Sequence, residues 1–257
     1  MIKMGTQKLL QGDCLELMKN IPDKSIDMIL CDLPYGITSC KWDSIIPFDK
    51  LWEQYNRIIK DNGAIVLTAS QPFTSALIMS NPTMFKYNWI WEKHKAGNFV
   101  LANYQPLRVH EDICIFGNFR TVYTPSKNKN YNPQMVKGTP YSRGKINNVK
   151  WNGRKVKCGH THNNKSGLRY PRSIIKFNKV NGGSVHPTQK PVELMEYLIK
   201  TYTNEGDLVL DNCMGSGTTG VACKNLNRDF IGIELDEGYF KIASERIHDV
   251  ILGADEK

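Results

Sequence analysis

Asp211-Asn212-Cys213-Met214-Gly215-Ser216-Gly217-Thr218-Thr219 follows the short apolar run at 208–210 and precedes a segment with helical character at about 218–226. The apolar run predicts a buried strand, and the glycines then allow the backbone to approach a ligand closely. The first amide groups of the following helix are free to donate hydrogen bonds. No Lys-Ser or Lys-Thr pair follows the glycines, so the turn is not a P-loop for nucleoside triphosphates.

An acidic residue ends the next predicted strand. Residues 230–233 are apolar or Gly, and Glu234 follows them, 23 residues after Asp211. An acid in this place commonly accepts hydrogen bonds from ribose hydroxyls. The order strand, glycine turn, helix, strand and acid therefore predicts a site for an adenosine-containing cofactor. The alternative is a tight turn between a strand and a helix, with Glu234 in solvent.

Strand and helix patterns also alternate in the rest of the chain. Strands are predicted at 8–11, 25–31, 64–67, 87–91 and 112–116, and helices at 14–21, 48–60, 72–80, 192–201 and 239–250. The helix at 48–60 should end before Asn62-Gly63. Repeated strand–helix units predict an α/β fold with a mainly parallel sheet that carries helices on both faces.

Asp32-Leu33-Pro34-Tyr35 stands at the carboxyl end of the predicted strand 25–31, where ligands bind in such sheets. An exocyclic base amine is a poor nucleophile, because its lone pair is delocalised into the ring. Asp32 can accept one N–H of such an amine, and a main-chain carbonyl, that of Leu33, can accept the other. Pro34 stiffens the turn, and Tyr35 can stack on a base that has left the duplex. As an isolated motif, the same residues could equally form a structural turn.

The positive charge of the chain is concentrated in one segment. The formal net charge is +9, and the stretch between Asp112 and Glu193 contains sixteen Lys and Arg residues and no acid. The rest of the chain carries 18 cations against 25 acids. An acid-free stretch of this length indicates a polyanionic partner, and nucleic acid is the obvious one. We expect nucleic-acid contacts from Lys145, Lys150, Trp151, Arg154, Lys155, Lys157, Arg169 and Arg172.

These motifs resemble those of the beta-group amino-methyltransferases of DNA, over nearly the whole chain. In that family a D-P-P-Y block comes first, then a target-recognition region, then the block D-P-F-x-G-S-G-T-T. His186-Pro187-Thr188-Gln189-Lys190-Pro191 matches the family's H-P-T-Q-K-P, Gly12-Asp13 resembles the block whose Asp contacts the cofactor adenine, and residues 52–63 resemble a further conserved helix and turn. The resemblance implies a Rossmann-like S-adenosylmethionine-dependent methyltransferase fold. It places the catalytic half at 1–117, a target-recognition insert at 118–184 and the cofactor-binding half at 185–257.

The resemblance also implies roles for individual residues. The cofactor would be held by Asp13, Lys190, Asp211, Cys213, Gly215, Ser216, Gly217, Thr218, Thr219 and Glu234. Lys190 would bind the cofactor carboxylate, although a solvent-exposed lysine at the start of a helix is a close alternative. Arg108-Val109-His110-Glu111 looks like another family block, for which we expect the role of a structural pair.

Two departures from the family pattern are evident. Leu33 replaces the first Pro of D-P-P-Y, and Asn212 and Cys213 replace the Pro and Phe of the glycine block. Family members with Asp at the first position generally methylate adenine N6, so Asp32 favours adenine in double-stranded DNA. Methylation of cytosine N4 or of RNA, or a non-catalytic DNA-binding module, are the alternatives.

The remaining expectations are less specific. Seven scattered cysteines without a CxxC pair argue against a disulfide framework, and Cys158-Gly159-His160-Thr161-His162 lacks a second ligand pair, so we expect no metal. No apolar run approaches the roughly 20 residues that span a bilayer. We expect a cytoplasmic, nucleoid-associated protein. A homodimer and a cognate restriction nuclease are conceivable partners.

Overall fold

The computed structural model describes residues 6–36, 43–119, 121, 131–143, 146–151, 154–158, 162–178 and 189–252. Side chains are described for all of these except 143, 146–151, 154–158, 162 and 249–252. The chain divides into two compact units, the first formed by Met1–Asn132 with Ser173–Lys257 and the second by Pro133–Arg172. The second unit is shorter than the segment 118–184 that the sequence marks out.

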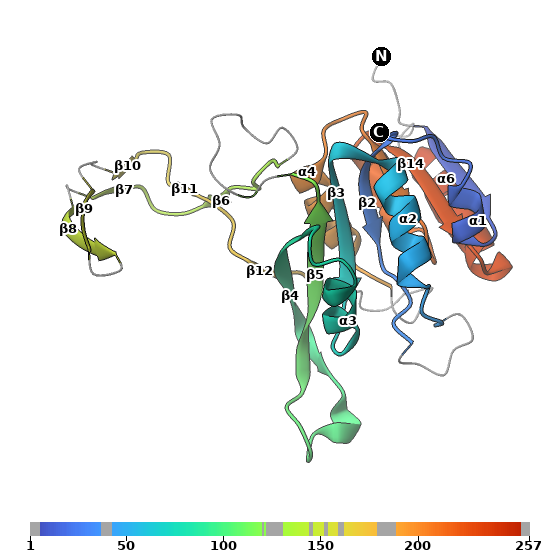
Figure 1. Ribbon diagram of the computed structural model, residues 1–257, viewed down its shortest axis with the longest axis horizontal. Coiled ribbons are helices and arrows are strands. Elements are labelled where there is room, and N and C mark those ends of the chain that lie inside the picture. The colour runs from blue at the N-terminus through green and yellow to red at the C-terminus, as the bar shows by residue number, and fades with distance from the viewer. Residues whose placement is uncertain are drawn as a thin grey trace. The chain divides into compact units, whose positions relative to one another are not determined.

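The first unit is built on one eight-stranded sheet (Figure 1). Its strands, in spatial order, are β1 (Gln7–Gln11), β14 (Asp229–Glu234), β13 (Leu208–Asp211), β2 (Ile26–Cys31), β3 (Ile59–Ala69), β5 (Arg108–Gly117), β4 (Phe85–Gly97) and β12 (Ile174–Lys176). Neighbours are parallel except that β5 runs antiparallel to both β3 and β4. The predicted α/β fold with a mainly parallel sheet is confirmed.

Each face of the sheet carries three helices and its own apolar core. Helices α1 (Cys14–Met18), α2 (Phe48–Ile58) and α3 (Phe73–Ser80) pack on one face. Helices α4 (Val192–Tyr202), α5 (Thr218–Asn225) and α6 (Glu237–Leu252) pack on the other. The apolar run of β2 serves both cores, because Met28 and Leu30 point to one and Ile29 and Cys31 to the other. This double burial fixes the strand that ends at Asp32.

Several elements differ in length from the expected ones. Helix α2 ends at Ile58, and β3 begins at Ile59 rather than after Asn62-Gly63. Ile59 pairs with Ile26 of β2, and Lys60 forms an ion pair with Asp27 at 2.7 Å, so long-range pairing extends the strand back past the turn signal. Strand β12 lies inside the segment predicted as an insert, yet it pairs with β4 of the main sheet.

Strands β4 and β5 are also longer than their apolar centres at 87–91 and 112–116. They form a two-stranded ribbon that extends past the ends of the other strands (Figure 1, green). A short 3-10 turn, Phe99–Leu101, lies at the tip. The ribbon residues are polar and do not alternate with apolar ones, so the sequence pattern does not predict these extensions. Pairing between the two strands holds them in place.

The described residues of the second unit form three antiparallel strand pairs. These are β6 (Val136–Lys137) with β11 (Leu168–Arg169), β7 (Tyr141–Arg143) with β10 (His162–Asn164), and β8 (Ile146–Trp151) with β9 (Arg154–Cys158). Within 133–142 and 163–172, every residue except Gly167 is exposed or half-buried. Hairpin hydrogen bonds, rather than an apolar core, therefore organise the described part of this unit.

Among the described residues, no helix has both the length and the apolar character required to cross a membrane.

Candidate active site

A cavity of about 660 Å³ lies at the carboxyl ends of the central parallel strands. It is lined by residues of the two predicted motifs, which stand far apart in the sequence, and by side chains from β3, β4 and β5. The lining includes Gly12, Asp13, Asp32, Leu33, Pro34, Tyr35, Thr68, Glu111, Lys190, Asp211, Cys213, Gly215, Ser216, Thr218, Thr219 and Glu234. Its volume is in the range of cavities that enclose small ligands. The fold therefore brings the Asp32 turn and the glycine turn to one space.

The glycine turn after β13 adopts a conformation that favours glycine. Gly215 has φ of +51° and Gly217 has φ of +79°. A Cβ on Gly217 would lie 2.9 Å from the Cβ of Ala243, whereas a Cβ on Gly215 would meet nothing within 4 Å. Close packing on α6 thus requires the second glycine, and the first leaves open space beside the backbone.

Two carboxylates hold this turn in place. The amide of Gly215 donates to Oε2 of Glu234 at 2.8 Å. Asp211 accepts from the hydroxyl of Thr219 at 2.6 Å and from the amide of Cys213 at 3.1 Å. Burial raises the pKa of Asp211 to about 7, although these hydrogen bonds oppose the shift. Both acids accept hydrogen bonds from groups of the turn, and Glu234 also lines the cavity.

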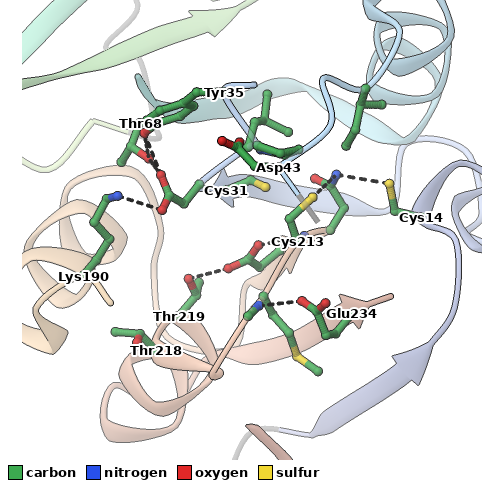
Figure 2. A pocket seen from close by; sticks show the side chains of 18 of the residues that line it. Cys14, Cys31, Tyr35, Asp43, Thr68, Lys190, Cys213, Thr218, Thr219 and Glu234 are labelled. Carbon is green, nitrogen blue, oxygen red and sulfur yellow. Dashed lines mark hydrogen bonds and ion pairs between the residues drawn. The ribbon is translucent and has the colours of Figure 1, made fainter. Parts of the chain in front are cut away.

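The carboxylate of Asp32 is engaged at both oxygens by three side chains that Figure 2 labels, Tyr35, Thr68 and Lys190. Its Oδ1 accepts from the Tyr35 hydroxyl at 2.7 Å and from the Thr68 hydroxyl. Its Oδ2 accepts from Nζ of Lys190 at 2.7 Å. Tyr35 stacks on Phe73 with ring centroids 5.0 Å apart, and burial raises the pKa of its hydroxyl well above the ordinary value.

Leu33 shows how the chain accommodates its departure from D-P-P-Y. The side chain is 3% exposed and belongs to the core formed with α1, α2 and α3. A larger apolar residue than proline is therefore accepted because it contributes to the core on that face. Pro34 follows it along the edge of the cavity.

Lys190 is buried, with 8% of its surface exposed. The alternative of a solvent-exposed lysine is therefore wrong. It pairs with Asp32 and also lies 3.3 Å from Oε2 of Glu111, which in turn pairs with Lys93. Burial opposes the charged form of Lys190, but Asp32 and Glu111 outweigh it and raise its pKa. Burial likewise opposes ionisation of Glu111, but Lys190 and Lys93 outweigh it and lower its pKa.

The other residues expected at the cofactor have mixed surroundings. Asp13 is exposed and caps α1, accepting from the amides of Leu15 and Glu16 at 2.8 and 3.2 Å. Ser216 accepts from Arg246 through its hydroxyl at 2.9 Å and through its main-chain oxygen. Thr218 is the first residue of α5 and is 7% exposed. His186, Pro187 and Thr188 of the H-P-T-Q-K-P stretch lie outside the described residues.

Three cysteines gather where the family has an aromatic residue (Figure 2). Asn212 donates to Sγ of Cys213 at 3.5 Å and of Cys14 at 3.7 Å, and it accepts from the hydroxyl of Tyr55 at 2.6 Å. Cys31 is 2% exposed at the end of β2, and burial raises its pKa to about 12. Cys14, Cys31 and Cys213 are free thiols and line the cavity.

The residues expected to contact nucleic acid lie in the second unit. Lys145 lies outside the described residues, and only the backbone is described for Lys150, Trp151, Arg154, Lys155 and Lys157. Arg169 stacks on Tyr141 at 4.6 Å and donates to the main-chain oxygens of Gly167 and Thr139. Arg172 is exposed. No cluster of metal-ligating side chains occurs within the described ranges, which exclude 159–161.

Sequence reasoning did not anticipate Thr68 or the position of Glu111. Thr68 follows the apolar run 64–67, so the rule that ligands lie at the carboxyl ends of parallel strands could have identified it. The expected structural pair within 108–111 does not form as such, because Arg108 donates to Ser70 at 2.7 Å while Glu111 contacts lysines. No local signal marks Glu111, since its partner Lys190 is distant in the sequence.

Comparison with known proteins assigns this arrangement to one group. Residues 26–245 match the N6/N4 methyltransferase family, described as DNA methylase. The type II methyltransferase M.HpaI of Haemophilus parainfluenzae is 28% identical over 265 residues, 97% of this chain and 76% of that protein. M1.MboII of Moraxella bovis is 28% identical over 258 residues, 92% of this chain and 95% of that protein.

Solved structures agree with these matches. The M1.HpyAVI complex with S-adenosylmethionine (SAM) has a TM-score of 0.60 at 25% identity, covering 94% of this chain and 99% of that one. The cytosine-N4-specific PvuII methyltransferase has a TM-score of 0.66 at 15% identity, covering 96% of this chain and 92% of that one. The second likeness supports the fold alone.

Proposed function

The chain belongs to the N6/N4 family of DNA methylases and depends on SAM, and we propose that it methylates N6 of adenine in double-stranded DNA. The observation that carries this proposal is the presence of Asp32 in the same cavity as the glycine turn. In the group that the motifs resemble, Asp at this position generally accompanies adenine. Cytosine N4 is the second candidate, because the family whose model matches this chain covers N4 as well as N6 methyltransferases.

The cavity suits SAM at the glycine turn. The space beside Gly215 accepts a ligand against the backbone, and the turn leads directly into the amino end of α5. Glu234, at the end of β14, would accept hydrogen bonds from the ribose hydroxyls. Asp13 follows β1, which flanks β14 on the side away from the glycine turn, and it would face the adenine. Each carboxylate keeps acceptor capacity besides the amide hydrogen bonds that it already accepts. When bound, SAM supplies a methyl group activated by its sulfonium.

The turn after β2 would prepare the amine of the target base. Asp32 accepts one N–H and the main-chain oxygen of Leu33 accepts the other, which turns the nitrogen lone pair toward the methyl group. The negative carboxylate then stabilises the positive charge that develops on nitrogen. Tyr35, held against Phe73, presents an aromatic surface to the flipped base. No covalent bond between enzyme and base is required.

The second unit would provide the contacts to DNA. It is cationic, free of acids and without an apolar core in its described part. These properties suit a segment that contacts phosphates and base edges. Replacing Lys150, Arg154, Lys155 and Lys157 together by Ala should weaken DNA binding and flatten its dependence on salt, with SAM affinity unchanged.

The decisive test is transfer of labelled methyl groups to methylation-free plasmid DNA, followed by analysis of the nucleosides. We expect N6-methyldeoxyadenosine, and sequencing of the product identifies the recognition motif. N4-methyldeoxycytidine would establish the second candidate, and transfer only to RNA would refute both. DNA binding without SAM binding in calorimetry would instead indicate a non-catalytic module.

A further inference from the structure

The carboxylate of Asp32 has only one acceptor position open for the target amine, at Oδ2 beside the ammonium group of Lys190. Its Oδ1 accepts from Tyr35 and Thr68, and its Oδ2 is paired with Lys190 at 2.7 Å. An incoming N–H that takes this position comes to lie beside the ammonium group of Lys190. This argument rests on the proposed role of Asp32 toward an exocyclic amine.

Lys190 is the partner of Asp32 that has a second acceptor close by. Its Nζ lies 3.3 Å from Oε2 of Glu111. That oxygen is buried and makes no hydrogen bond of acceptable geometry to any described residue. A small movement of the ammonium group would therefore exchange its hydrogen bond to Asp32 for one to Glu111. The two hydroxyl groups are held at Oδ1 by each other as well, since Tyr35 also contacts Thr68 at 3.1 Å.

Charge also favours removal of Lys190 rather than of a hydroxyl group. The amine nitrogen becomes positive as the bond to the methyl group forms, and a carboxylate paired with an ammonium group has little charge left to stabilise it. An ammonium group that stayed at Oδ2 would repel the reacting nitrogen as that nitrogen becomes positive. Glu111, which lies between Lys93 and Lys190, is the buried acid able to receive this charge.

We propose that Lys190 shifts from Asp32 to Glu111 when the target base enters, and that Glu111 is the positioning residue that makes Asp32 available. The resting pair neutralises the half-buried carboxylate of Asp32, whose side chain is 29% exposed. The shifted pair leaves Asp32 as a free acceptor beside the amine. Glu111 acts through Lys190 and does not itself touch the substrate.

The test compares Glu111→Gln with the double variant Glu111→Gln/Lys190→Met in single-turnover transfer at saturating SAM and DNA. Gln keeps the shape of Glu111 but lacks its negative charge, so the ammonium group of Lys190 should stay on the charged carboxylate of Asp32. We expect the rate to fall about 100-fold, in the range found when one electrostatic group of an active site is removed. Removing Lys190 as well should raise the rate at least about tenfold above Glu111→Gln.

A matched control is Glu92→Gln. Glu92 also pairs with a lysine, Lys176, at 2.8 Å, but this pair is exposed and neither residue lines the cavity. Its substitution should leave the transfer rate unchanged. SAM affinity, measured by calorimetry, should change less than about threefold in Glu111→Gln, and thermal unfolding reports whether the fold is intact.

Four outcomes decide the matter. A normal rate in Glu111→Gln, with an active wild type, would overturn this inference and leave the proposed function intact. A double variant slower than Glu111→Gln would also overturn it, because the rate losses of the two substitutions would add if Glu111 were merely structural. A Lys190→Met variant that loses SAM affinity, together with a normal Glu111→Gln, would show that Lys190 moves to the cofactor carboxylate instead. A wild type without transfer would refute the proposed function itself.

Discussion

The turn after β13 and the turn after β2 border the same cavity, but their polar groups are satisfied differently. In the first, Asp211 accepts from an amide and a hydroxyl of its own turn, and Glu234, at the end of the neighbouring strand β14, accepts from another amide of that turn. In the second, Asp32 accepts from Tyr35 of its own turn and also from Lys190 and Thr68, side chains from distant parts of the chain. One turn is complete in itself, and the other is assembled from partners that can be exchanged. Substitutions should accordingly affect cofactor binding and stability at the first turn and transfer rate at the second.

The largest effect is expected from Asp32→Ala. The amine loses its charged acceptor, so transfer to DNA should fall by about 1,000-fold, the upper range for loss of one such group. SAM affinity should be nearly unchanged, because the glycine turn does not depend on Asp32. Labelled methyl transfer and calorimetry measure the two quantities. Transfer at the wild-type rate would remove Asp32 from the mechanism.

The glycine turn can be disrupted by Gly217→Ala, with Gly215→Ala as its matched partner. Both place a Cβ at positive φ, but only that of Gly217 would meet Ala243 at 2.9 Å. Strain at positive φ costs roughly 1–2 kcal/mol, and crowding adds roughly 1–3 kcal/mol. Urea unfolding should therefore show a greater loss in Gly217→Ala. Equal losses would mean that contact with α6 does not constrain the turn.

The buried acid of the glycine turn predicts a dependence of stability on pH. The pKa of Asp211 is about 7 in the folded protein against 3.8 in its ordinary state. Between these values the unfolded chain has released a proton that the folded protein retains. The free energy of unfolding should thus fall as pH rises from about 4 to about 7, by at most about 1.4 kcal/mol per pH unit. The difference between wild type and Asp211→Asn should follow this slope, and parallel curves would contradict it.

The smallest effect is expected from Thr68→Val, which removes one hydrogen bond to Asp32 without changing shape. Loss of one such bond corresponds to about 1 kcal/mol, or about a fivefold slower transfer. Thr74→Val is the control, because Thr74 is equally buried and donates to Asp112 at 2.7 Å, away from the cavity lining. Similar stability losses with a slower rate only in Thr68→Val would support the positioning role. Equal rates would argue against it.

The self-contained turn could be predicted from sequence, and the exchangeable one only in part. Gly215, Gly217 and Glu234 are close in the chain, and their spacing predicts the contact between the glycine turn and the acid that the structure displays. Asp32 follows an apolar run whose burial on both sides fixes its position. The sheet was likewise predictable, because its strands alternate with helices.

The sequence could not predict the contacts that depend on tertiary pairing. Lys190 stands 158 residues from Asp32, and nothing in its neighbourhood indicates burial. The early start of β3 depends on Ile26 and Asp27 of another strand. In the sequence, β12 falls within the basic segment. The composition of that segment reflects the polar residues around β12 and gives no sign of its pairing with β4.

The thiols beside the glycine turn have a practical consequence for handling the protein. Alkylating reagents such as iodoacetamide attack thiolates, and Cys14, Cys31 and Cys213 all have raised pKa values. At neutral pH these groups remain protonated, so a cavity that is rich in cysteine should resist such labelling. Inhibition by these reagents would therefore trace to another site or to loss of the native fold, and ordinary cysteine-directed probes are poorly suited to reporting on cofactor occupancy.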